Sequence, residues 1–325
     1  MKSGAEILIH DCASVRRGEA VLIVTDAERR PIGSVLREVA DEAGAEVTMV
    51  VSPPRGIDNE EPVPMVAAAM RSAQVIFMPV SHSLAHTRAT RDAIASGARV
   101  LSMAAFTEDQ MRAGGLFADF RERKPVCDAI AARMNDARLI RVTNPAGTDL
   151  TLSIEGRPGN SHSCVLDGPG FTAVPNIEAN IAPNEGSAEG ILVADGSIPY
   201  YGIGVLDEPI RFEISAGAVR FIEGSKQADF ISQLLASQND PNVYNIAQFA
   251  IGLNPMCTEL NGVMLNDEGV NGTIHIGIGT SANLGGEIRA TTHFDAIIRQ
   301  PSVWLDDEPI LQAGELAAEA EKLEG

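Results

Sequence analysis

Histidine and aspartate residues near the C-terminus have the types and spacing of metal ligands. His293 and Asp295 form an H-x-D pair, and residues two apart on an extended strand project from one face, so one metal ion could contact both side chains. His275 lies in the alternating run TIHIGIG and would share a face with Gly277 and Gly279, which leave open space before the imidazole. Imidazoles combined with carboxylates suit zinc, manganese, cobalt or iron better than calcium or magnesium. These residues predict a transition-metal site.

The segment NIEANIAPNEGSAEG adds a group of carboxylates to these candidates. It holds Glu178, Glu185 and Glu189, which is more charge than a core strand tolerates, and therefore indicates a loop. Glu178 is expected to act as a fourth ligand or as a general base, and Glu185 or Glu189 could take the role of base if Glu178 binds metal. The alternative for each glutamate is a solvated acidic loop without a catalytic role.

Longer stretches around these residues resemble a known family. NIEANIAPNEGSAEG, NIAQFAIGLNP, MLNDEGVNGTIHIGIG and ATTHFD are similar to the metal-site motifs of the aminopeptidase T type leucyl aminopeptidases, which are two-metal exopeptidases. The same stretches, with DGPG, NDPNVY and VWLDDEPILQAGEL, also resemble 2,5-dihydroxypyridine 5,6-dioxygenase, a mononuclear Fe(II) ring-cleaving relative. The resemblance covers most of residues 138–315, and before residue 130 it rests on an α/β pattern and on VSHSLAHTRA.

The aminopeptidase resemblance implies metal ligands at Glu178, His275, His293 and Asp295. The family's further ligand is a glutamate between two metals, and Gln248 stands at that position here. A neutral amide oxygen is a weaker ligand than a carboxylate, so the substitution favours one bound metal over two.

Two further positions distinguish the relatives. The aminopeptidases' catalytic tyrosine would fall near Ala282, but no tyrosine follows Tyr244, and such a lost oxyanion donor is normally worth roughly 3 kcal/mol. The dioxygenase resemblance implies iron held by the H-x-D pair and by a histidine at the position of Gln248. His275 could replace that histidine and complete a set of two imidazoles and one carboxylate. The resemblance also implies that His82 faces the active site, where it would orient the substrate.

Two functions follow from these residues. The leading prediction is an aminopeptidase-like hydrolase of a small amide, peptide or lactam, in which zinc, manganese or cobalt activates a water molecule. The alternative is a mononuclear Fe(II) dioxygenase that opens a hydroxylated pyridine-like ring. Both take a small-molecule substrate.

The elements that must position these residues form two regions. From Ala20 to Met103, short β-branched runs alternate with amphipathic segments that end in glycine, which predicts an α/β domain with a parallel sheet over residues 1–135. FTEDQMRAGG and VCDAIAARMND are expected to be helical. Residues 136–325 then read as strands separated by turns, which predicts an α+β domain rich in antiparallel strands, with the metal site in the cleft. The C-terminal AGELAAEAEKLEG is expected to form a short acidic helix.

Composition excludes several partners. The 325 residues hold 25 Lys and Arg against 44 Asp and Glu, and the net charge of −19 repels nucleic acid and anionic membranes. No apolar stretch approaches the ~20 residues of a membrane-spanning helix, and the N-terminus has no signal-peptide pattern, so a cytoplasmic protein is expected. The cysteines form no CxxC pair and indicate neither a disulfide framework nor a zinc knuckle. The resemblance implies a homodimer or a higher homo-oligomer.

Overall fold

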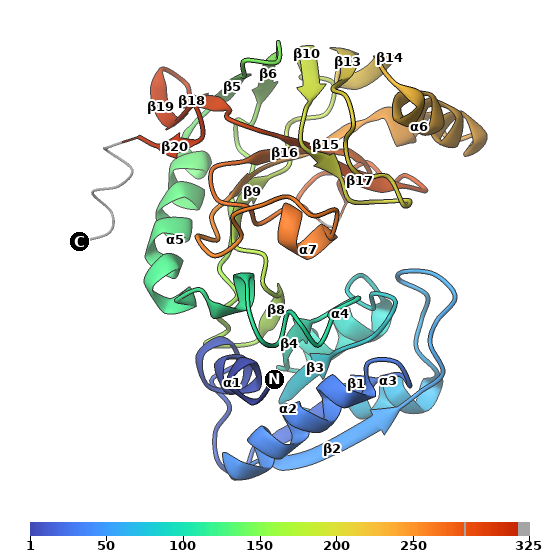
Figure 1. Ribbon diagram of the computed structural model, residues 1–325, viewed down its shortest axis with the longest axis vertical. Coiled ribbons are helices and arrows are strands. Elements are labelled where there is room, and N and C mark those ends of the chain that lie inside the picture. Colours follow the sequence, from blue (N-terminus) through green and yellow to red (C-terminus); the bar gives the residue numbers. More distant parts are fainter. Residues whose placement is uncertain (283, 318–325) are drawn as a thin grey trace. The chain divides into compact units, whose positions relative to one another are not determined.

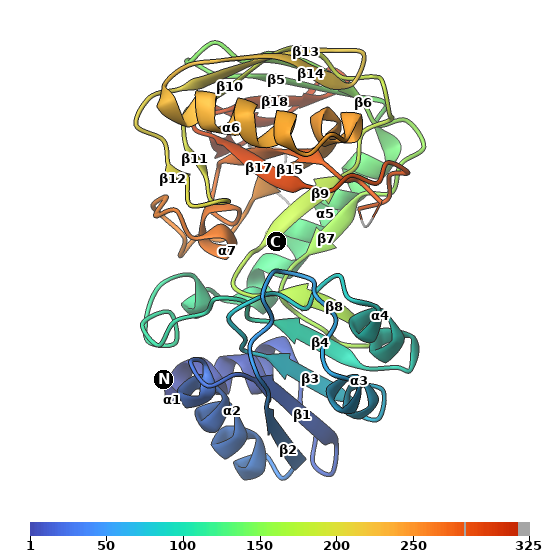
Figure 2. The same cartoon turned by 90° about the vertical axis from the view of Figure 1, so that its right-hand side faces the viewer.

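The computed structural model describes residues 1–282 and 284–317, which fall into two compact units (Figures 1 and 2). The first comprises Met1–Arg121 and Cys164–Pro175, and the second comprises Glu122–Ser163 and the chain from Asn176 onward. This division differs from the single boundary predicted at residue 135. The difference arises because Cys164–Pro175 contributes a strand to the sheet of the first unit.

The first unit is built on a parallel sheet, as the alternating pattern predicted. Its strand order is β2-β1-β3-β4-β8. Buried aliphatic runs such as AVLIVT and VIFM supply the central strands, which need apolar side chains on both faces. Helix α2 (Arg30–Glu42) covers one face with α1 (Lys2–Glu6), while α3 (Pro64–Met70) and α4 (Arg88–Ala95) cover the other (Figure 2). The strands are β1 (Ala20–Thr25), β2 (Glu46–Val51), β3 (Val75–Met78), β4 (Arg99–Ser102) and β8 (Gly170–Ala173).

The second unit is rich in antiparallel strands, also as predicted. An eight-stranded sheet has the order β14-β13-β10-β6-β5-β18-β19-β20, and a five-stranded sheet has the order β17-β16-β15-β9-β7. Its helices are α5 (Phe120–Asp136), which begins just before the unit boundary, α6 (Lys226–Ser237) and α7 (Met264–Asp267), and β11 (Ser197–Ile198) pairs with β12 (Gly204–Val205). The remaining strands are β5 (Leu139–Thr143), β6 (Asp149–Ser153), β7 (Asn160–His162), β9 (Glu178–Ile181), β10 (Glu189–Ala194), β13 (Ile210–Ser215), β14 (Ala218–Glu223), β15 (Ile246–Gly252), β16 (Ile274–Gly279), β17 (His293–Ile298), β18 (Ser302–Leu305), β19 (Glu308–Gln312) and β20 (Glu315–Leu316).

Three segments show features that the sequence did not predict. FTEDQMRAGG forms turns followed by a short 3-10 helix, Gly115–Phe117, because Gly114 adopts a left-handed φ of 87° that stops helix propagation. The N-terminal residues continue from α1 into a π-helix, Ile7–Cys12. In the expected acidic C-terminal helix, Glu315–Leu316 instead pairs with β19 as strand β20, and residues 318–325 lie outside the described residues.

The five-stranded sheet has one apolar and one polar face. Ile274, Ile276 and Ile278 of β16 are fully buried and alternate with His275 and the glycines of TIHIGIG. The same alternation continues in β17 and β15, so the apolar side chains of neighbouring strands meet on one face of the sheet. The candidate functional residues are thereby directed to the other face.

Over residues 1–282 and 284–317, no helix is both long and apolar enough to span a membrane.

Candidate active site

The polar face of the five-stranded sheet gathers the predicted metal ligands. In the strand register, Gln248 of β15 faces Gly277 of β16, and Gly277 faces Asp295 of β17. His293 faces Gly279 one step further along. Residues that lie directly opposite one another in antiparallel strands share a face. The sheet thus brings Gln248, His293 and Asp295 together with His275, as the sequence predicted.

Glu178 joins this face from strand β9 and not from a loop. It pairs with Gly252 of β15 on one side and with His162 of β7 on the other. Only 4% of Glu178 is exposed, so the alternative of a solvated acidic loop is wrong for this residue. The segment forms a strand because its polar residues alternate with Ala179 and Ile181, which are fully buried on the opposite face.

Gly277 provides the space in which these side chains meet. A Cβ atom at this position would lie 2.7 Å from Cβ of Gln248, 2.9 Å from Cε1 of His293 and 3.1 Å from Oδ1 of Asp295. Any larger residue would therefore displace three candidate functional side chains at once. Gly277 was expected to leave space in front of His275. The side chains nearest to it are instead those of Gln248, His293 and Asp295.

His293 and Asp295 form a close pair. Nε2 of His293 lies 3.5 Å from Oδ1 of Asp295, and Nδ1 of His293 is 2.9 Å from the Thr280 carbonyl oxygen. Burial lowers the pKa of His293, but the Asp295 carboxylate outweighs burial and leaves that pKa above its ordinary value. Burial would raise the pKa of Asp295, but the nearby His293 and His275 imidazoles hold it well below its usual range.

A tyrosine and a further glutamate complete the surroundings of Asp295. The Tyr200 hydroxyl lies 2.7 Å from Oδ2 of Asp295 and 2.8 Å from Oε1 of Glu268. Burial and the nearby Asp295 and Glu178 carboxylates raise the pKa of Glu268 well above its ordinary value. The Tyr200 hydroxyl is the donor in both contacts, so its single proton is shared between Asp295 and Glu268.

Amides hold the carboxylate of Glu178. Asn180 Nδ2 donates to Oε1 at 2.6 Å, and Asn176 Nδ2 donates to Oε2 at 2.8 Å. Gln248 Nε2 donates to Oε1 at 3.3 Å, and Nε2 of His275 lies 3.4 Å from Oε2. These contacts fix the orientation of the Glu178 carboxylate.

The donor set fits a metal ion. Its members form two pairs, His293 with Asp295 and His275 with Glu178. Among residues 1–282 and 284–317, no three His, Cys, Asp or Glu side chains already converge on one metal position. Nδ1 of His275 and Oδ1 of Asp295 are nevertheless buried without a hydrogen-bond partner, a costly state that a cation would relieve. The contact of His293 Nδ1 with the Thr280 carbonyl suits a tautomer whose Nε2 can bind metal.

The other predicted catalytic glutamates make structural contacts. Oε2 of Glu185 accepts a hydrogen bond from Nη2 of Arg157, and Oε1 accepts one from the Glu287 amide at 2.7 Å. Glu189 is exposed at the start of β10 and accepts from the Ala216 amide. Both oxygens of Glu185 are therefore occupied in joining loops.

His82 belongs to the first unit and follows strand β3. Its side chain is 41% exposed, and Nδ1 lies 3.5 Å from Oδ1 of Asp58. Its expected role in orienting substrate stays a prediction.

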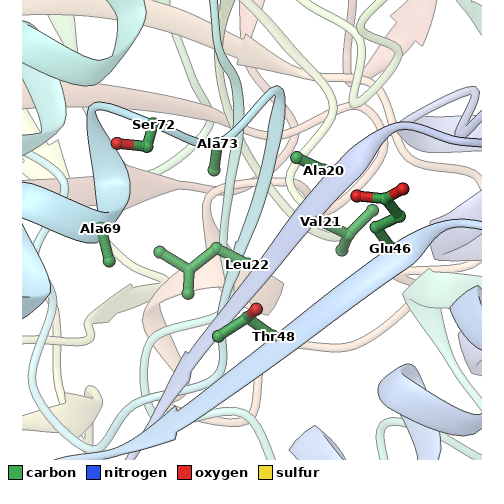
Figure 3. A pocket seen from close by; sticks show the side chains of 8 residues that line it. All are labelled: Ala20, Val21, Leu22, Glu46, Thr48, Ala69, Ser72 and Ala73. Atoms are coloured by element: carbon green, nitrogen blue, oxygen red, sulfur yellow. The ribbon is translucent and has the colours of Figure 1, made fainter.

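A separate hollow in the first unit lacks this chemistry (Figure 3). Apart from the Glu46 carboxylate, small or apolar side chains and two hydroxyls line it: Ala20, Val21, Leu22, Thr48, Ala69, Ser72 and Ala73. It contains none of the predicted site residues.

Three residues on or beside the polar face were not predicted from the sequence. His162 occupies β7 beside Glu178, and burial lowers its pKa. Glu268 stands within MLNDEGVNG, a motif noted without assigning this residue a role. No motif in the sequence pointed to Tyr200, because the aminopeptidase resemblance placed the catalytic tyrosine near Ala282.

Comparison with known proteins decides between the two relatives. The family model described as 2,5-dihydroxypyridine 5,6-dioxygenase matches residues 9–318. The chain belongs to this family. The leading prediction of an aminopeptidase-like hydrolase is therefore wrong, and the alternative is the one supported. The four ligand positions implied by the aminopeptidase resemblance carried too much weight in that prediction.

Individual relatives of this dioxygenase family agree with the assignment. A 2,5-dihydroxypyridine 5,6-dioxygenase of Pseudomonas putida is 28% identical over 198 residues, which is 58% of this chain. That match spans only 57% of the relative's length. The solved structure of 2,5-dihydroxypyridine dioxygenase from Pseudomonas putida KT2440 has a TM-score of 0.81 at 22% identity, covering 98% of both chains. Wild-type AmpT from Thermus thermophilus has a TM-score of 0.72 at 16% identity, again over 98% of both chains. These two likenesses establish the shared fold.

Proposed function

We propose that this protein is a metal-dependent dioxygenase that cleaves the ring of a hydroxylated pyridine. The family match over residues 9–318 carries the proposal. The geometry of the polar face supports it, since Nδ1 of His275 and Oδ1 of Asp295 are buried on this face without a hydrogen-bond partner. A dioxygenase places both atoms of O2 in the product, so the reaction needs no external reductant.

His293, Asp295 and His275 would hold the metal. Two imidazoles and one carboxylate suit Fe(II), the metal of the dioxygenase alternative, and leave positions open for other ligands. The chemistry that Fe(II) supplies when bound is the activation of O2 toward the electron-rich ring. Gln248 stands where the dioxygenase resemblance implied the second imidazole, and its Nε2 donates a hydrogen bond to Glu178.

The chain's own residues would orient the substrate and move a proton. Glu178 is ionisable, buried and held by amide donors, so it can accept a proton from a ring hydroxyl group at a fixed position. The polar atoms of Asn180 and Gln248 limit the orientations that a flat heteroaromatic ring can adopt there. His82 is proposed as a further orienting residue from the first unit.

Metal content and oxygen uptake test this proposal together. The protein is purified without oxygen, loaded with Fe²⁺, and mixed with 2,5-dihydroxypyridine and O2. We expect about one iron per chain and one O2 consumed per ring opened. The double variant His293→Ala/Asp295→Ala should keep its fold and lose both iron and oxygen uptake. Iron-loaded protein that leaves hydroxylated pyridines untouched would contradict the proposal.

Assembly and location remain predictions of their own. We propose a homo-oligomer, which light scattering coupled to size-exclusion chromatography would test by the mass in solution. The cytoplasm is the proposed location, in keeping with the negative net charge, and cell fractionation would test it.

A further inference from the structure

A short hairpin brings two adjacent tyrosines to the edge strand of the active-site sheet. Strands β11 and β12 flank Tyr200 and Tyr201, and the Tyr200 carbonyl accepts a hydrogen bond from the Ile203 amide. The hairpin is anchored beside β17, because the Gly196 amide donates to the Ile297 carbonyl at 3.0 Å. A Cβ atom on Gly196 would lie only 2.7 Å from that carbonyl oxygen, which shows how closely the two segments pack.

A second contact anchors the hairpin at its base. Ser197 is fully buried, and its hydroxyl donates to Oδ2 of Asp267 at 2.6 Å. Asp267 also accepts from the amides of Asn261 and Gly262, so its carboxylate is fixed by the loop before α7. Both contacts lie at the start of β11, so the strand that leads to Tyr200 is fixed three residues before it.

The two tyrosines have different surroundings. Tyr200 is half-buried, and its hydroxyl contacts the carboxyl groups of Asp295 and Glu268. Tyr201 is 43% exposed, packs edge-on against Phe294, and directs its hydroxyl to the main-chain oxygen of His293 at 3.4 Å. The Tyr200 hydroxyl contacts the side chain of a proposed metal ligand, whereas the Tyr201 hydroxyl contacts a main-chain oxygen.

The contact of Tyr200 divides the two oxygens of Asp295 between different tasks. Oδ2 accepts the tyrosine hydroxyl at 2.7 Å, whereas Oδ1 is buried without a hydrogen-bond partner and lies 3.5 Å from Nε2 of His293. Rotation of the carboxylate would break the Tyr200 contact. The hydroxyl therefore keeps Oδ1 on the side of His293.

We propose that Tyr200 is the positioning residue of the metal site, which holds the Asp295 carboxylate so that Oδ1 faces the ion bound with His293. Glu268 supports this role, because it contacts Tyr200 and is itself held through Asn176, whose amide group donates to both Glu268 and Glu178. One chain of contacts thus links Asp295 to Glu178. This inference rests on the proposed metal site. It adds Tyr200, from a hairpin distant in sequence, as the residue that orients one of the metal ligands.

The matched variants Tyr200→Phe and Tyr201→Phe test this role with Co²⁺ as the probe. Each removes one hydroxyl from the same hairpin. The dissociation constant for Co²⁺ and the visible spectrum of the bound ion are measured without substrate, together with the unfolding temperature. Loss of an outer partner of a metal ligand typically weakens affinity ~10–100-fold, and this is the change expected for Tyr200→Phe. Tyr201→Phe should bind Co²⁺ like the unaltered protein.

Wild-type affinity and an unchanged cobalt spectrum in Tyr200→Phe would overturn the proposal. The proposed function would survive that result, whereas failure of the unaltered protein to bind Co²⁺ or Fe²⁺ would contradict the metal site itself.

A third measurement tests the role of Tyr200 if Tyr200→Phe does not fold. The chain has three tyrosines, so Tyr200 is the sole tyrosine in Tyr201→Phe/Tyr244→Phe. Addition of Co²⁺ should then change the near-ultraviolet absorption of tyrosine, and an unchanged absorption would refute the role of Tyr200.

Discussion

Gly277 faces Asp295 across the β16–β17 pair, and the space above it is bounded by the edge of the His293 ring. A methyl group there would lie 2.9 Å from Cε1 of His293 and 2.7 Å from Cβ of Gln248, closer than real contacts allow. The smallest possible side chain at residue 277 is thus incompatible with the observed arrangement.

We expect Gly277→Ala to lower the free energy of unfolding by about 1–3 kcal/mol, the usual cost of overpacking, and to reduce metal binding at least ~10-fold. Chemical denaturation and metal titration measure the two effects. Gly168→Ala is the control, because a Cβ atom at residue 168 meets nothing within 4 Å. Tight metal binding by Gly277→Ala would show that the ion lies elsewhere.

Gln248 stands in the same row as Gly277 and Asp295, at the position where the dioxygenase resemblance implies a histidine. Imidazole is a better iron ligand than an amide, so Gln248→His should raise Fe²⁺ affinity on the order of tenfold. Isothermal titration under anaerobic conditions measures it. Gln248→Leu keeps the bulk without the donor and should bind iron no better than the unaltered protein. Equal affinities in all three proteins would mean that residue 248 does not reach the ion.

Asp26 gives the first unit a pH-dependent stability. It follows β1, and its carboxylate accepts backbone hydrogen bonds from Ser81 at 2.6 Å and from Glu28 and Arg29 at 3.1 Å. Burial would raise its pKa, but these amides outweigh burial and lower the pKa. The folded state therefore favours the ionised form. Its contribution to stability is complete above the unfolded pKa of about 3.9 and is lost as the pH falls through the lower folded pKa.

Asp26→Asn should consequently cost about 1–3 kcal/mol near neutral pH, with a smaller difference from the unaltered protein in acid. Urea unfolding at a series of pH values measures this difference. Glu28→Gln serves as the control, since the Glu28 side chain is 68% exposed and contacts only Ser81 Oγ at 3.3 Å and Arg29 Nη2 at 3.2 Å among the described residues. A difference in stability that grew on acidification would contradict a lowered pKa for Asp26 in the folded state.

Glu185 should act through stability and not through catalysis. Its two oxygens bind Arg157 and the Glu287 amide, so Glu185→Gln should lower the free energy of unfolding by about 1–3 kcal/mol while iron content and turnover per folded chain persist. Glu178→Gln is the comparison, and it should reduce turnover at least ~100-fold if Glu178 is the base. Loss of turnover with full stability in Glu185→Gln would restore its predicted catalytic role.

The sequence by itself indicated the class of each unit and the candidate metal ligands. The parallel sheet of the first unit followed from alternating β-branched and amphipathic segments, and the antiparallel character of the second followed from its turns. The runs TIHIGIG and HFD indicated His275, His293 and Asp295, because residues two apart in a strand project from the same face of the sheet. The resemblance to two families could not decide the reaction, because it implies His293 and Asp295 as metal ligands in both.

Tertiary structure alone decided what surrounds those ligands. Tyr200 meets Asp295 across 95 residues of chain, and Asn176 meets Glu268 across 92, through hairpins and loops that carry no local pattern. The return of β8 to the first sheet and the Arg157 partner of Glu185 are equally non-local. Periodicity reveals which face a residue occupies within its own strand. Contacts between distant segments depend on the packing of the whole unit, which no short stretch of sequence records.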